Sequence, residues 1–514
     1  MPALTFPAVL AAAAAEVPDD EALVFGDARL TFAQLQEHVR RCARAFLATA
    51  IRPGDRVAIW APNSDRWVIA ALGLVSVGAV LVPVNTRFKG EEAQHVLAAT
   101  GARLLVVDDG FLDGNRLAML ATAEPLPALE TVVRLDGEGD DGWARFLDRA
   151  NTVDEADAGK AADGVAPDAV SDLIFTSGTT GRPKGVMVTH EQGVRLFSTW
   201  AQTVGLRRGD RMLVVAPFFH TFGYKAGMLA CLVQRATLLP VQVFDVPATM
   251  DLVQREKVTV VPGPPTLYST LLEHPQRSAY DLSSVRLAVT GASVVPTELI
   301  RRMRDELGFE TVLTAYGLTE CGGYATGCRQ GDPDEVVSLT SGRAIDGVEV
   351  RVVDEQGAPV ATGEPGEVVV RGYNVMLGYW EDPEATAAAV DSDGWLHTGD
   401  VGVLDEGGNL RITDRLKDMY VVGGFNAYPA EVEQVLVRHE AVSEAAVVGV
   451  PDERLGEVGQ AFVVARTGAQ PDPDALIAWC RERLAGYKVP RRVVLVDALP
   501  RNATGKVDKK LLRS

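Results

Sequence analysis

Residues 172–190 read DLIFTSGTTGRPKGVMVTH, and this stretch decides how the rest of the chain is interpreted. A short apolar run at 173–175 precedes ten residues rich in glycine and hydroxyl groups, and apolar residues resume at 186–188. Apolar runs of this length, bounded by turn residues, are typical of buried strands. The pattern therefore predicts a loop between two strands.

The loop has the composition of a phosphate cradle. Three glycines allow the backbone to approach an anion closely, four hydroxyls can donate to phosphate oxygens, and Arg182 and Lys184 add positive charge. It is not a Walker A loop, because that motif needs lysine directly after glycine and a hydroxyl after the lysine, whereas Pro183 precedes Lys184 and Gly185 follows it. A flexible surface hairpin is the alternative. The density of hydroxyls and cations favours the cradle.

The segment TSGTTGRPKG at 176–185 resembles the signature loop of the adenylate-forming superfamily, which includes acyl-CoA synthetases, adenylation domains of peptide synthetases and luciferases. The resemblance extends from about Leu30 to Lys506, with the core motifs in the family order. It implies an enzyme that uses ATP, Mg²⁺ and CoA, and it makes Thr176 a catalytic residue and metal ligand. The loop residues to which it assigns nucleotide contacts are Thr176, Ser177, Gly178, Thr179, Thr180 and Lys184.

Composition indicates a soluble globular protein, with 47% hydrophobic and 23% charged residues. The net charge of −19 argues against binding to nucleic acid or to an anionic membrane. Five scattered cysteines include no Cys-x-x-Cys pair, so neither a zinc site nor a disulfide framework is indicated, and a cytoplasmic location is expected. The N-terminus has no basic residue before its apolar part and makes a poor secretory signal.

Residues 67–84 are uncharged and nearly long enough to span a bilayer. Gly78 and Pro83 interrupt the segment, and its second half is β-like. A membrane span is the alternative, but a buried helix followed by a buried strand is the favoured interpretation.

Alternating helix and strand patterns predict an α/β fold. A helix is expected over 30–49 with Thr31 as its cap, and strands are expected at 56–60, 104–107, 212–216, 258–261 and 287–290. Residues 135–168 are expected to be a loop-rich surface passage. We expect a large N-terminal domain, 1–414, of mostly parallel sheets flanked by helices, with a β-rich subdomain from about 332 to 414. A small mobile α+β lid domain, 415–514, is expected to follow.

Charge distribution supports that boundary, since residues 415–514 carry a net charge of +2 and residues 481–514 alone carry +7. A basic tail on an acidic protein suits a polyanionic small ligand, although a solvated charged surface is the alternative.

Other motifs receive nucleotide-site roles by resemblance. In YGLTE, at 316–320, Tyr316 stacks on the base, Thr319 binds phosphate and Glu320 holds Mg²⁺, a cation that prefers oxygen ligands. Asp400 suits the vicinal hydroxyls of a ribose. The remaining residues with expected roles are Gly291, Ala292, Ser293, Gly317 and Arg415 at the nucleotide, Lys417 as the hinge, and Lys506 as the catalytic lysine between carboxylate and α-phosphate.

The acyl pocket is expected around His220, which lies in the aromatic-rich segment PFFHTFG and would gate access of carboxylate and thiol. Glycines in the set would leave room for a bulky or long acyl group. Lys225 is unusual, because a buried ammonium is costly unless paired; if it faces the pocket, we hypothesise an acid with a keto group or a second carboxylate. The other pocket residues implied are Trp200, Phe222, Gly223, Tyr224, Gly263, Thr266, Gly322 and Gly323.

The segment at 423–429 resembles the wall of the pantetheine channel, with Gly423, Gly424 and Phe425 as the CoA contacts. Many relatives carry lysine just before the second glycine, where this chain has Val421, Val422 and Gly423. Charged contacts at that position are therefore not expected here.

The resemblance implies an ATP-dependent acid–CoA ligase that adenylates a carboxylic acid, transfers the acyl group to CoA and releases AMP and pyrophosphate. The acid is narrowed to a medium- or long-chain acid or a ring-bearing keto acid. Alternatives are an acyl-AMP ligase that loads a carrier protein, and a catalytically inactive nucleotide-binding scaffold. A homodimer is compatible with the sequence, which does not determine the oligomeric state.

Overall fold

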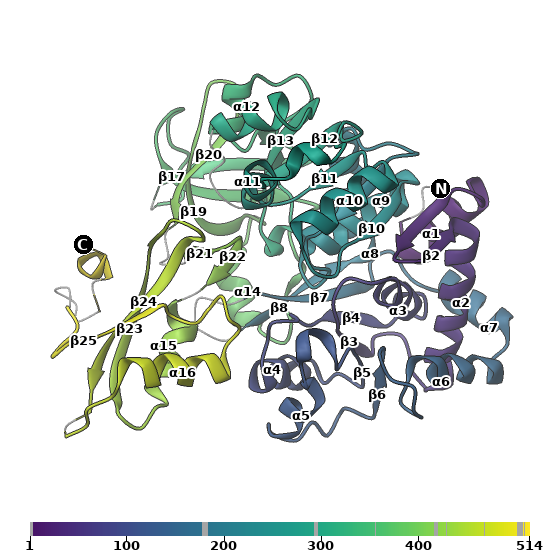
Figure 1. Cartoon of the computed structure of the whole chain (residues 1–514), viewed down its shortest axis with the longest axis horizontal. Helices are drawn as coiled ribbons and strands as arrows, with labels where there is room; N and C mark the ends of the chain where they lie inside the picture. Colours follow the sequence, from purple (N-terminus) through teal and green to yellow (C-terminus); the bar gives the residue numbers. More distant parts are fainter. Residues whose placement is uncertain are drawn as a thin grey trace.

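A computed structural model describes residues 4–176, 183–291, 297–354, 356–415, 420–427, 429–466, 468–500, 507 and 509–513. Three sheets with flanking helices form the larger part of the molecule, and a fourth sheet with its own helices forms a smaller C-terminal part (Figure 1). This arrangement confirms the predicted α/β fold with a small α+β C-terminal domain.

One sheet carries the glycine-rich loop. Its seven strands are, in spatial order, β18 (Gly378–Tyr379), β8 (Lys184–Thr189), β7 (Val170–Thr176), β4 (Val80–Pro83), β3 (Arg56–Trp60), β5 (Leu104–Val107) and β6 (Thr131–Arg134). The strands from β7 to β6 are parallel, whereas β8 and β18 are antiparallel to their neighbours. The loop joins β7 to β8, which confirms that two strands flank it.

A second sheet is parallel at its centre and antiparallel at its edges. Its nine strands are, in spatial order, β15 (Arg343–Ala344), β14 (Thr326–Gly327), β13 (Thr311–Tyr316), β12 (Leu287–Gly291), β11 (Val260–Pro262), β9 (Arg211–Val214), β10 (Thr237–Pro240), β1 (Glu21–Phe25) and β2 (Ala28–Thr31). Strands β12 and β13 are parallel neighbours, so Gly291 and Tyr316 end at the same edge of the sheet. Ligands of parallel sheets bind at this edge.

The β-rich subdomain is an antiparallel sheet of four strands, in the order β16 (Val348–Val353), β17 (Gly366–Gly372), β19 (Leu396–Leu404) and β20 (Leu410–Arg415). Its last two strands pair Asp400 with Arg415. Strand β20 ends at Arg415, and the domain boundary between residues 414 and 415 stays a prediction.

The C-terminal sheet has five strands: β22 (Phe425–Ala427), β21 (Tyr420–Val422), β24 (Gly456–Ala465), β23 (Val442–Asp452) and β25 (Arg492–Leu495). Helices α15 (Pro429–Val437) and α16 (Pro473–Arg483) pack on one face through Val447 and Val463. Leu499 and Val507 pack against the other face, beside Ala446 and Val448. The two faces alternate along the strands because the side-chain period is two.

Helices surround the first two sheets. They are α1 (Phe6–Glu16), α2 (Phe32–Ala48), α3 (Asp65–Val75), α4 (Gly90–Thr100), α5 (Arg116–Ala121), α6 (Trp143–Asp148), α7 (Glu155–Asp163), α8 (His190–Val204), α9 (Ala230–Gln234), α10 (Val246–Glu256), α11 (Pro265–Glu273), α12 (Thr297–Asp305) and α13 (Asp334–Leu339), while α14 (Pro383–Ala389) adjoins β18. Short 3₁₀ turns occur at η1 (Phe111–Asp113), η2 (Arg149–Thr152), η4 (Arg277–Ala279), η5 (Thr319–Cys321) and η6 (Lys509–Leu512), and η3 (Phe222–Leu229) is a π-helix.

Helix α2 shows how the sequence pattern becomes packing. Thr31 caps it, and Thr31 and Gln34 satisfy each other's backbone N–H groups in a capping box, as expected for a cap at this position. Its buried face meets α3 closely, because a Cβ at Gly73 would lie 2.8 Å from Cys42 Sγ. Only glycine permits that approach.

The uncharged stretch 67–84 forms most of α3 followed by β4, as predicted, and both are buried. Within the described residues, no helix combines the length and apolar character needed to cross a membrane.

The prediction that 135–168 is loop-rich is wrong, because α6, η2 and α7 occupy much of it. Trp143 and Phe146 of α6 are buried, and Phe146 packs edge-on against Phe46 of α2 at 5.0 Å between ring centroids. Helix α7 buries only Ala158. A helix that buries so little needs no apolar stripe of helical period, so its sequence carries no such signal.

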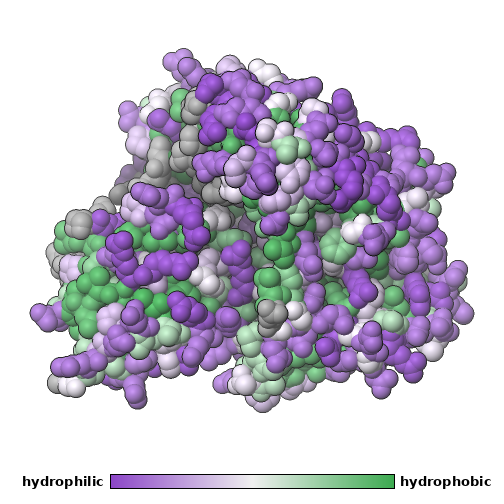
Figure 2. All heavy atoms as spheres, in the orientation of Figure 1, coloured by the Kyte–Doolittle hydropathy of each residue, from purple (hydrophilic) through white to green (hydrophobic). Residues whose placement is uncertain are grey.

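The surface is mainly hydrophilic on the face shown in Figure 2, with a hydrophobic area over the C-terminal sheet. Exposed large apolar side chains of that domain include Val494 and Leu495 of β25, at 37% and 43% exposure. The same view shows a furrow between the C-terminal part and the rest.

Candidate active site

Three residues from distant parts of the chain meet where the glycine-rich loop begins. The Thr176 hydroxyl, at the end of β7, lies 3.4 Å from Glu320 Oε1 and donates to it. The Tyr379 hydroxyl, on β18, donates to the same oxygen at 2.9 Å. The structure thus brings together the two predicted metal ligands, and it adds Tyr379, which the sequence analysis missed. A tyrosine in a two-residue edge strand carries no signal that separates it from a packing residue.

Burial of Glu320 raises the pKa of its carboxyl group, and the hydrogen bonds from Tyr379 and Thr176 oppose that rise. The charge of Asp400 raises it further, so both carboxylates lie within one electrostatic site. A carboxylate and a hydroxyl are donors that suit Mg²⁺, which binds one or two carboxylates and completes its shell with water and substrate phosphates. The residues fit this ion. Among the residues that the structure describes, no group of three or more His, Cys, Asp or Glu is placed so that it could hold a metal ion.

The second predicted contact pair is Tyr316 and Asp400. The Tyr316 hydroxyl donates to Asp400 Oδ2 at 2.7 Å, although 84 residues separate them. Burial raises the pKa of Tyr316, and the charge of Asp400 adds to the shift. Asp400 is 5% exposed, and its position on β19 is fixed by pairing with β20. The edge of the parallel sheet and the β-rich subdomain therefore meet at this hydrogen bond.

Lys184 lies beside this group. Its Nζ is 5.0 Å from the centre of the Tyr379 ring and 3.9 Å from an oxygen of Asp382. Lys184, which follows the loop, therefore lies close to Tyr379, the tyrosine that donates to Glu320.

The glycines of the expected acyl pocket do not leave open room. A Cβ at Gly223 would lie 2.3 Å from the carbonyl oxygens of residues 216 and 217. At Gly322 it would lie 2.6 Å from Leu196, and at Gly323 2.3 Å from Thr221. A Cβ at Gly317 would lie 2.4 Å from the backbone of Gly323. These glycines allow close packing of the chain, which corrects the expectation that they widen the pocket.

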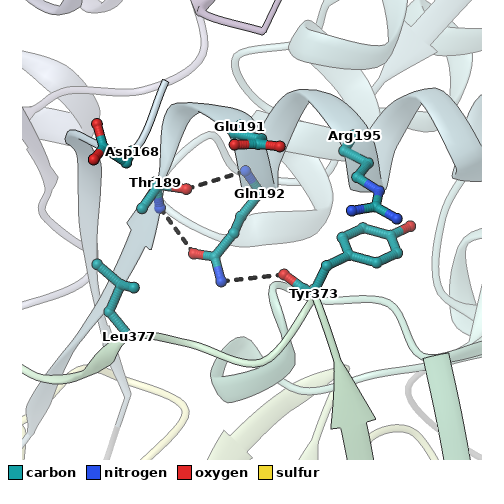
Figure 3. A pocket seen from close by; sticks show the side chains of 7 residues that line it. All are labelled: Asp168, Thr189, Glu191, Gln192, Arg195, Tyr373 and Leu377. Atoms are coloured by element: carbon teal, nitrogen blue, oxygen red, sulfur yellow. Dashed lines mark hydrogen bonds between the residues drawn. The ribbon is translucent and has the colours of Figure 1, made fainter. Parts of the chain in front are cut away.

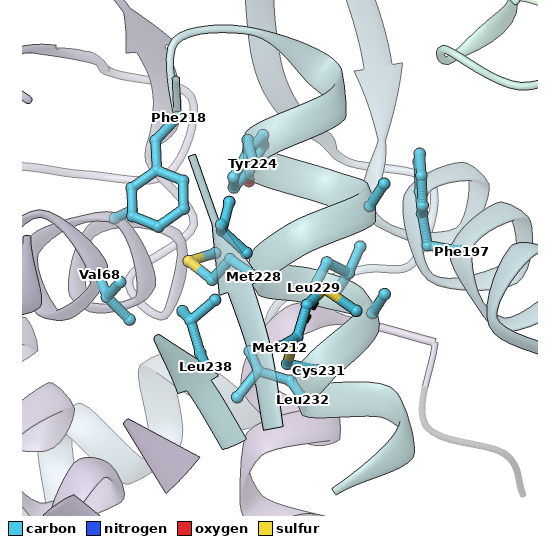
Figure 4. Close-up of a cluster of buried hydrophobic side chains, with 14 of the residues drawn as sticks. Val68, Phe197, Met212, Phe218, Tyr224, Met228, Leu229, Cys231, Leu232 and Leu238 are labelled. Atoms are coloured by element: carbon cyan, nitrogen blue, oxygen red, sulfur yellow. Dashed lines mark hydrogen bonds between the residues drawn. The ribbon is translucent and has the colours of Figure 1, made fainter. Parts of the chain in front are cut away.

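Trp200 and Tyr224 belong to the core. Trp200, on α8, is 1% exposed and lies 6.4 Å from the Phe197 ring. Tyr224, on η3, is fully buried, and its ring lies 5.7 Å from that of Trp67 and 6.0 Å from that of Phe6. Figure 4 shows Tyr224 within a cluster of apolar side chains that joins η3 to α3 and α8. The π-helix sets these directions, which periodicity of 3.6 residues would not predict.

Lys225 is also enclosed. It is fully buried, and its Nζ lies 2.9 Å from Oδ1 of the equally buried Asp172 on β7. The condition for our substrate hypothesis, that Lys225 faces the acyl pocket, is not met, because the ammonium is neutralised inside the protein. An aspartate in a buried strand was the signal that could have predicted this partner.

His220 and Phe222 remain at the surface of the site. His220 is exposed, Phe222 is half-buried, and the Phe222 amide donates to His220 Nδ1 at 3.2 Å. The neutral ring therefore carries its proton on Nε2. Gly263 is buried at the end of β11, where a Cβ would lie 3.1 Å from Leu267.

The expected CoA loop faces the N-terminal part of the molecule. A Cβ at Gly424 would lie 3.6 Å from Pro264, next to Gly263 of the predicted acyl pocket. Gly423 and Gly424 both have positive φ, 56° and 85°, which favours glycine in this turn. Phe425 stacks on Tyr487 with 4.9 Å between ring centroids.

Several predicted site residues lie outside the described part of the chain. They are Ser177, Gly178, Thr179, Thr180, Ala292, Ser293, Lys417 and Lys506. The side chains of Thr266 and Arg415 are also outside it, and the backbone of Arg415 pairs with Asp400. Thr319 opens η5 directly before Glu320.

A separate hollow of 310 Å³ lies at the start of α8 (Figure 3). Gln192 caps the helix through Thr189 and donates to the Tyr373 carbonyl oxygen at 3.1 Å, while the Arg195 guanidinium stacks on the Tyr373 ring at 3.9 Å. None of the predicted site residues that the structure describes lines this hollow, and its contacts attach α8 to the segment after β17.

The comparison with protein families matches nearly the whole chain. Residues 10–380 match the AMP-binding enzyme family, and residues 431–506 match the AMP-binding enzyme C-terminal domain. The chain belongs to the AMP-binding enzymes, and within them it is an AMP-forming acid–CoA ligase, which adenylates a carboxylic acid and transfers the acyl group to CoA.

Two similar relatives share one activity name. The 3-[(3aS,4S,7aS)-7a-methyl-1,5-dioxo-octahydro-1H-inden-4-yl]propanoyl:CoA ligases of Rhodococcus jostii (strain RHA1) and Mycobacterium tuberculosis (strain ATCC 25618 / H37Rv) are each 51% identical, over 99% of this chain and 98% of their own. A feruloyl-CoA synthase from Amycolatopsis sp is 38% identical over 96% of this chain and 95% of its own.

Solved structures agree in fold. The amide bond synthetase McbA from Marinactinospora thermotolerans has a TM-score of 0.86 at 30% identity, covering 99% of both chains. A mutant o-succinylbenzoate CoA synthetase from Bacillus subtilis, bound with a product analogue, has a TM-score of 0.82 at 29% identity, covering 98% of this chain and 97% of its own.

Proposed function

We propose that the acid is a ring-bearing keto acid, a propanoic acid carried on a reduced, methylated bicyclic dione. The observation that carries this proposal is the 51% identity, over 99% of the chain, to two ligases named for that acyl group. Relatives named for other acids are less similar, such as a feruloyl-CoA synthase at 38% identity and a medium-chain acyl-CoA ligase at 34%.

Recognition of the keto acid does not come from Lys225, since Asp172 neutralises it within the core. We assign polar contact with the acid to His220 instead. Its ring is exposed, and because Nδ1 accepts from the Phe222 amide, Nε2–H is available as a donor that suits a ketone or carboxylate oxygen. Phe222, half-buried next to it, supplies apolar area for the rings.

The chain's own residues hold the nucleotide in this proposal. Asp400 accepts from the ribose hydroxyls, Tyr316 stacks on the base, and Lys184 with the hydroxyl groups of the loop contacts phosphate. The Tyr316–Asp400 hydrogen bond of 2.7 Å supports these roles because it orients both groups at the edge of the parallel sheet. Positioned charge of this kind is the main means of stabilising transfer at phosphorus.

Glu320 and Thr176 would hold Mg²⁺, and their shared contact at 3.4 Å supports that role. When bound, the ion supplies positive charge that neutralises the phosphates. Tyr379 orients the Glu320 carboxylate by donating to Oε1.

The C-terminal domain is proposed to change orientation between adenylation and thioester formation, with Lys417 as hinge. In the orientation observed, Gly424 approaches Pro264 at the acyl side. Leu499 and Val507, which flank the segment of Lys506, pack on the sheet face opposite α15 and α16. This orientation supports thioester formation, because the CoA loop approaches the site.

The test is pyrophosphate release across a panel of acids, each with and without CoA. The panel contains the bicyclic keto acid, the same ring acid with its ketones reduced, plain fatty acids of several lengths and ferulic acid. We expect CoA-dependent turnover with the highest kcat/KM for the keto acid. A higher kcat/KM for a fatty acid or ferulic acid would overturn the substrate proposal, and release that CoA does not accelerate would favour carrier-protein loading.

We also propose a cytoplasmic location. All five cysteines are buried and unpaired, as suits a reducing compartment. A homodimer stays a prediction, which size-exclusion chromatography with light scattering tests.

A further inference from the structure

A buried cluster of three charges joins the C-terminal domain to the N-terminal domain. Lys488 Nζ lies 2.6 Å from Glu431 Oε1 and 3.0 Å from Glu92 Oε1. Lys488 and Glu431 belong to the C-terminal domain, whereas Glu92 lies in α4 of the N-terminal domain. The Lys488 side chain is 1% exposed, and those of Glu92 and Glu431 are 9% and 8% exposed.

The cluster depends on the contact between the domains. Burial raises the pKa of Glu92, and the Lys488 charge acts against that rise. The charges of Glu92 and Glu431 raise the pKa of Lys488 despite its burial. A buried ammonium needs such partners, because an unpaired charge is costly to bury. Glu92 is the one member of the cluster contributed by the other domain.

Neighbouring contacts show that the cluster is the centre of an interface. Helix α16 packs beside α4, and Ala485 is buried among apolar residues of the N-terminal domain. Asn85 donates to the Tyr487 hydroxyl at 3.3 Å. At the rim, Arg438 and Glu91 form an ion pair between the domains at 3.2 Å, but both side chains are more than half exposed, at 55% and 59%.

We propose that Glu92 and Lys488 form a latch that holds the C-terminal domain in the orientation for thioester formation. Both are positioning residues that act through the Gly423–Gly424 loop, which this orientation places beside Pro264. The inference rests on the two-step ligase reaction and not on the identity of the acid.

The latch can open because the charges on both of its sides keep a partner or gain water when the domains separate. Lys488 keeps Glu431 within its own domain, and Glu92 gains water. Glu431 Oε2 has no hydrogen-bond partner among the described atoms, so the closed cluster is short of full satisfaction. Because the domain must rotate in every catalytic cycle, the free energy of the latched orientation must lie only a little below that of the open one.

The kinetic test compares two neighbouring glutamates on one helix. Glu92→Gln removes the charge at the latch but retains an oxygen that can accept the Lys89 amide, as Glu92 Oε2 does at 3.0 Å. Glu92→Lys puts a second ammonium beside Lys488. Glu91→Gln and Glu91→Lys make the same changes at the exposed rim pair. Adenylation is measured as single-turnover pyrophosphate release without CoA. Thioester formation is measured by adding CoA to enzyme that is already loaded with acyl-adenylate.

We expect Glu92→Gln to slow thioester formation about tenfold, and Glu92→Lys more, while adenylation stays within about twofold of the parent. The Glu91 variants change either step by less than about threefold. The acid used is whichever the panel shows to be activated best, so failure of the keto-acid proposal leaves this test intact. Equal slowing of both steps, or equal effects at Glu91 and Glu92, would overturn the latch.

A distance measurement provides a readout independent of turnover. Spin labels are attached at Glu124→Cys and Glu453→Cys, two exposed positions in different domains, and the native cysteines are all buried. We expect Glu92→Gln to shift the population of interdomain distances away from that of the parent, and Glu91→Gln to leave it unchanged. An unchanged distribution in Glu92→Gln would refute the latch.

Discussion

Asp172 and Lys225 form an ion pair inside the protein, with Oδ1 2.9 Å from Nζ and side chains 0% and 1% exposed. Asp172 lies on β7, four residues before Thr176, and Lys225 lies on the π-helix that follows His220. The pair therefore connects the strand that leads into the glycine-rich loop with the helix that follows His220. The role of the pair is structural, because each charge neutralises the other inside the protein.

Replacing Lys225 alone should destabilise the protein without changing acid selectivity. Lys225→Met leaves a buried carboxylate unpaired, which costs about 3–5 kcal/mol. We expect a clear fall in melting temperature, and KM values for keto and plain fatty acids that change by the same factor. Asp172→Asn in the same chain should restore most of the melting temperature, because no unpaired charge remains. A KM increase confined to keto acids would contradict this assignment.

Tyr379→Phe should weaken binding of MgATP. The substitution removes the hydroxyl that donates to Glu320 Oε1 at 2.9 Å, and a hydrogen bond to a charged group contributes about 1.5–3 kcal/mol. We expect the apparent KM for MgATP to rise about tenfold or more, with an altered Mg²⁺ dependence. Tyr373→Phe is the matched control, since its hydroxyl contacts Thr199 at the surface hollow. Equal effects of the two substitutions would exclude a positioning role.

His190 should make the protein less stable in mild acid. Burial, with the Lys225 charge as a second cause, lowers the pKa of His190 from 6.5 to about 3. The folded protein therefore keeps this ring neutral while the unfolded chain takes up a proton. The contribution is complete above the unfolded pKa and is lost as pH falls from 6.5 towards 3, by about 1.4 kcal/mol per pH unit.

Urea denaturation between pH 7 and pH 5 measures this slope. In His190→Gln, the free energy of unfolding should change less steeply with pH than in the parent, because one proton fewer is taken up on unfolding. This difference in slope is expected whatever the absolute stability of the variant. Parallel slopes for the two proteins would show that the ring is not held neutral.

Gly223→Ala should disrupt the acyl side of the site. The added Cβ would meet two carbonyl oxygens at 2.3 Å, so the backbone from 216 to 223, which carries His220, must move. We expect kcat/KM for the acid to fall about a hundredfold or more, as misplacement by about an ångström can produce. Gly159→Ala, in α7 with no heavy atom within 4 Å, should stabilise the helix by about 0.5–1 kcal/mol without changing activity. Normal activity of Gly223→Ala would contradict the packing argument.

Local patterns predicted most elements because their causes are local. Thr31 and Gln34 form a capping box, the apolar runs flanking the loop form β7 and β8, and the interrupted apolar stretch forms α3 and β4. Helices α6 and α7 were missed since one is short and the other buries almost nothing. Side-chain direction in η3 was missed because a π-helix shifts the period that such predictions assume.

The sequence by itself determined the family and the fold class, because the glycine-rich loop, YGLTE and the later motifs are short segments whose residue types define their chemistry. The residues that it assigns to that chemistry stay predictions. Tertiary structure alone decided which of them meet. The Tyr316 contact with Asp400 spans 84 residues, the Tyr379 contact with Glu320 spans 59, and the Lys488 contact with Glu92 spans 396. It also decided that Lys225 is a core residue. Such pairings depend on how the sheets and domains pack. Two charges that are far apart in the sequence become partners only when folding removes both from water at the same place.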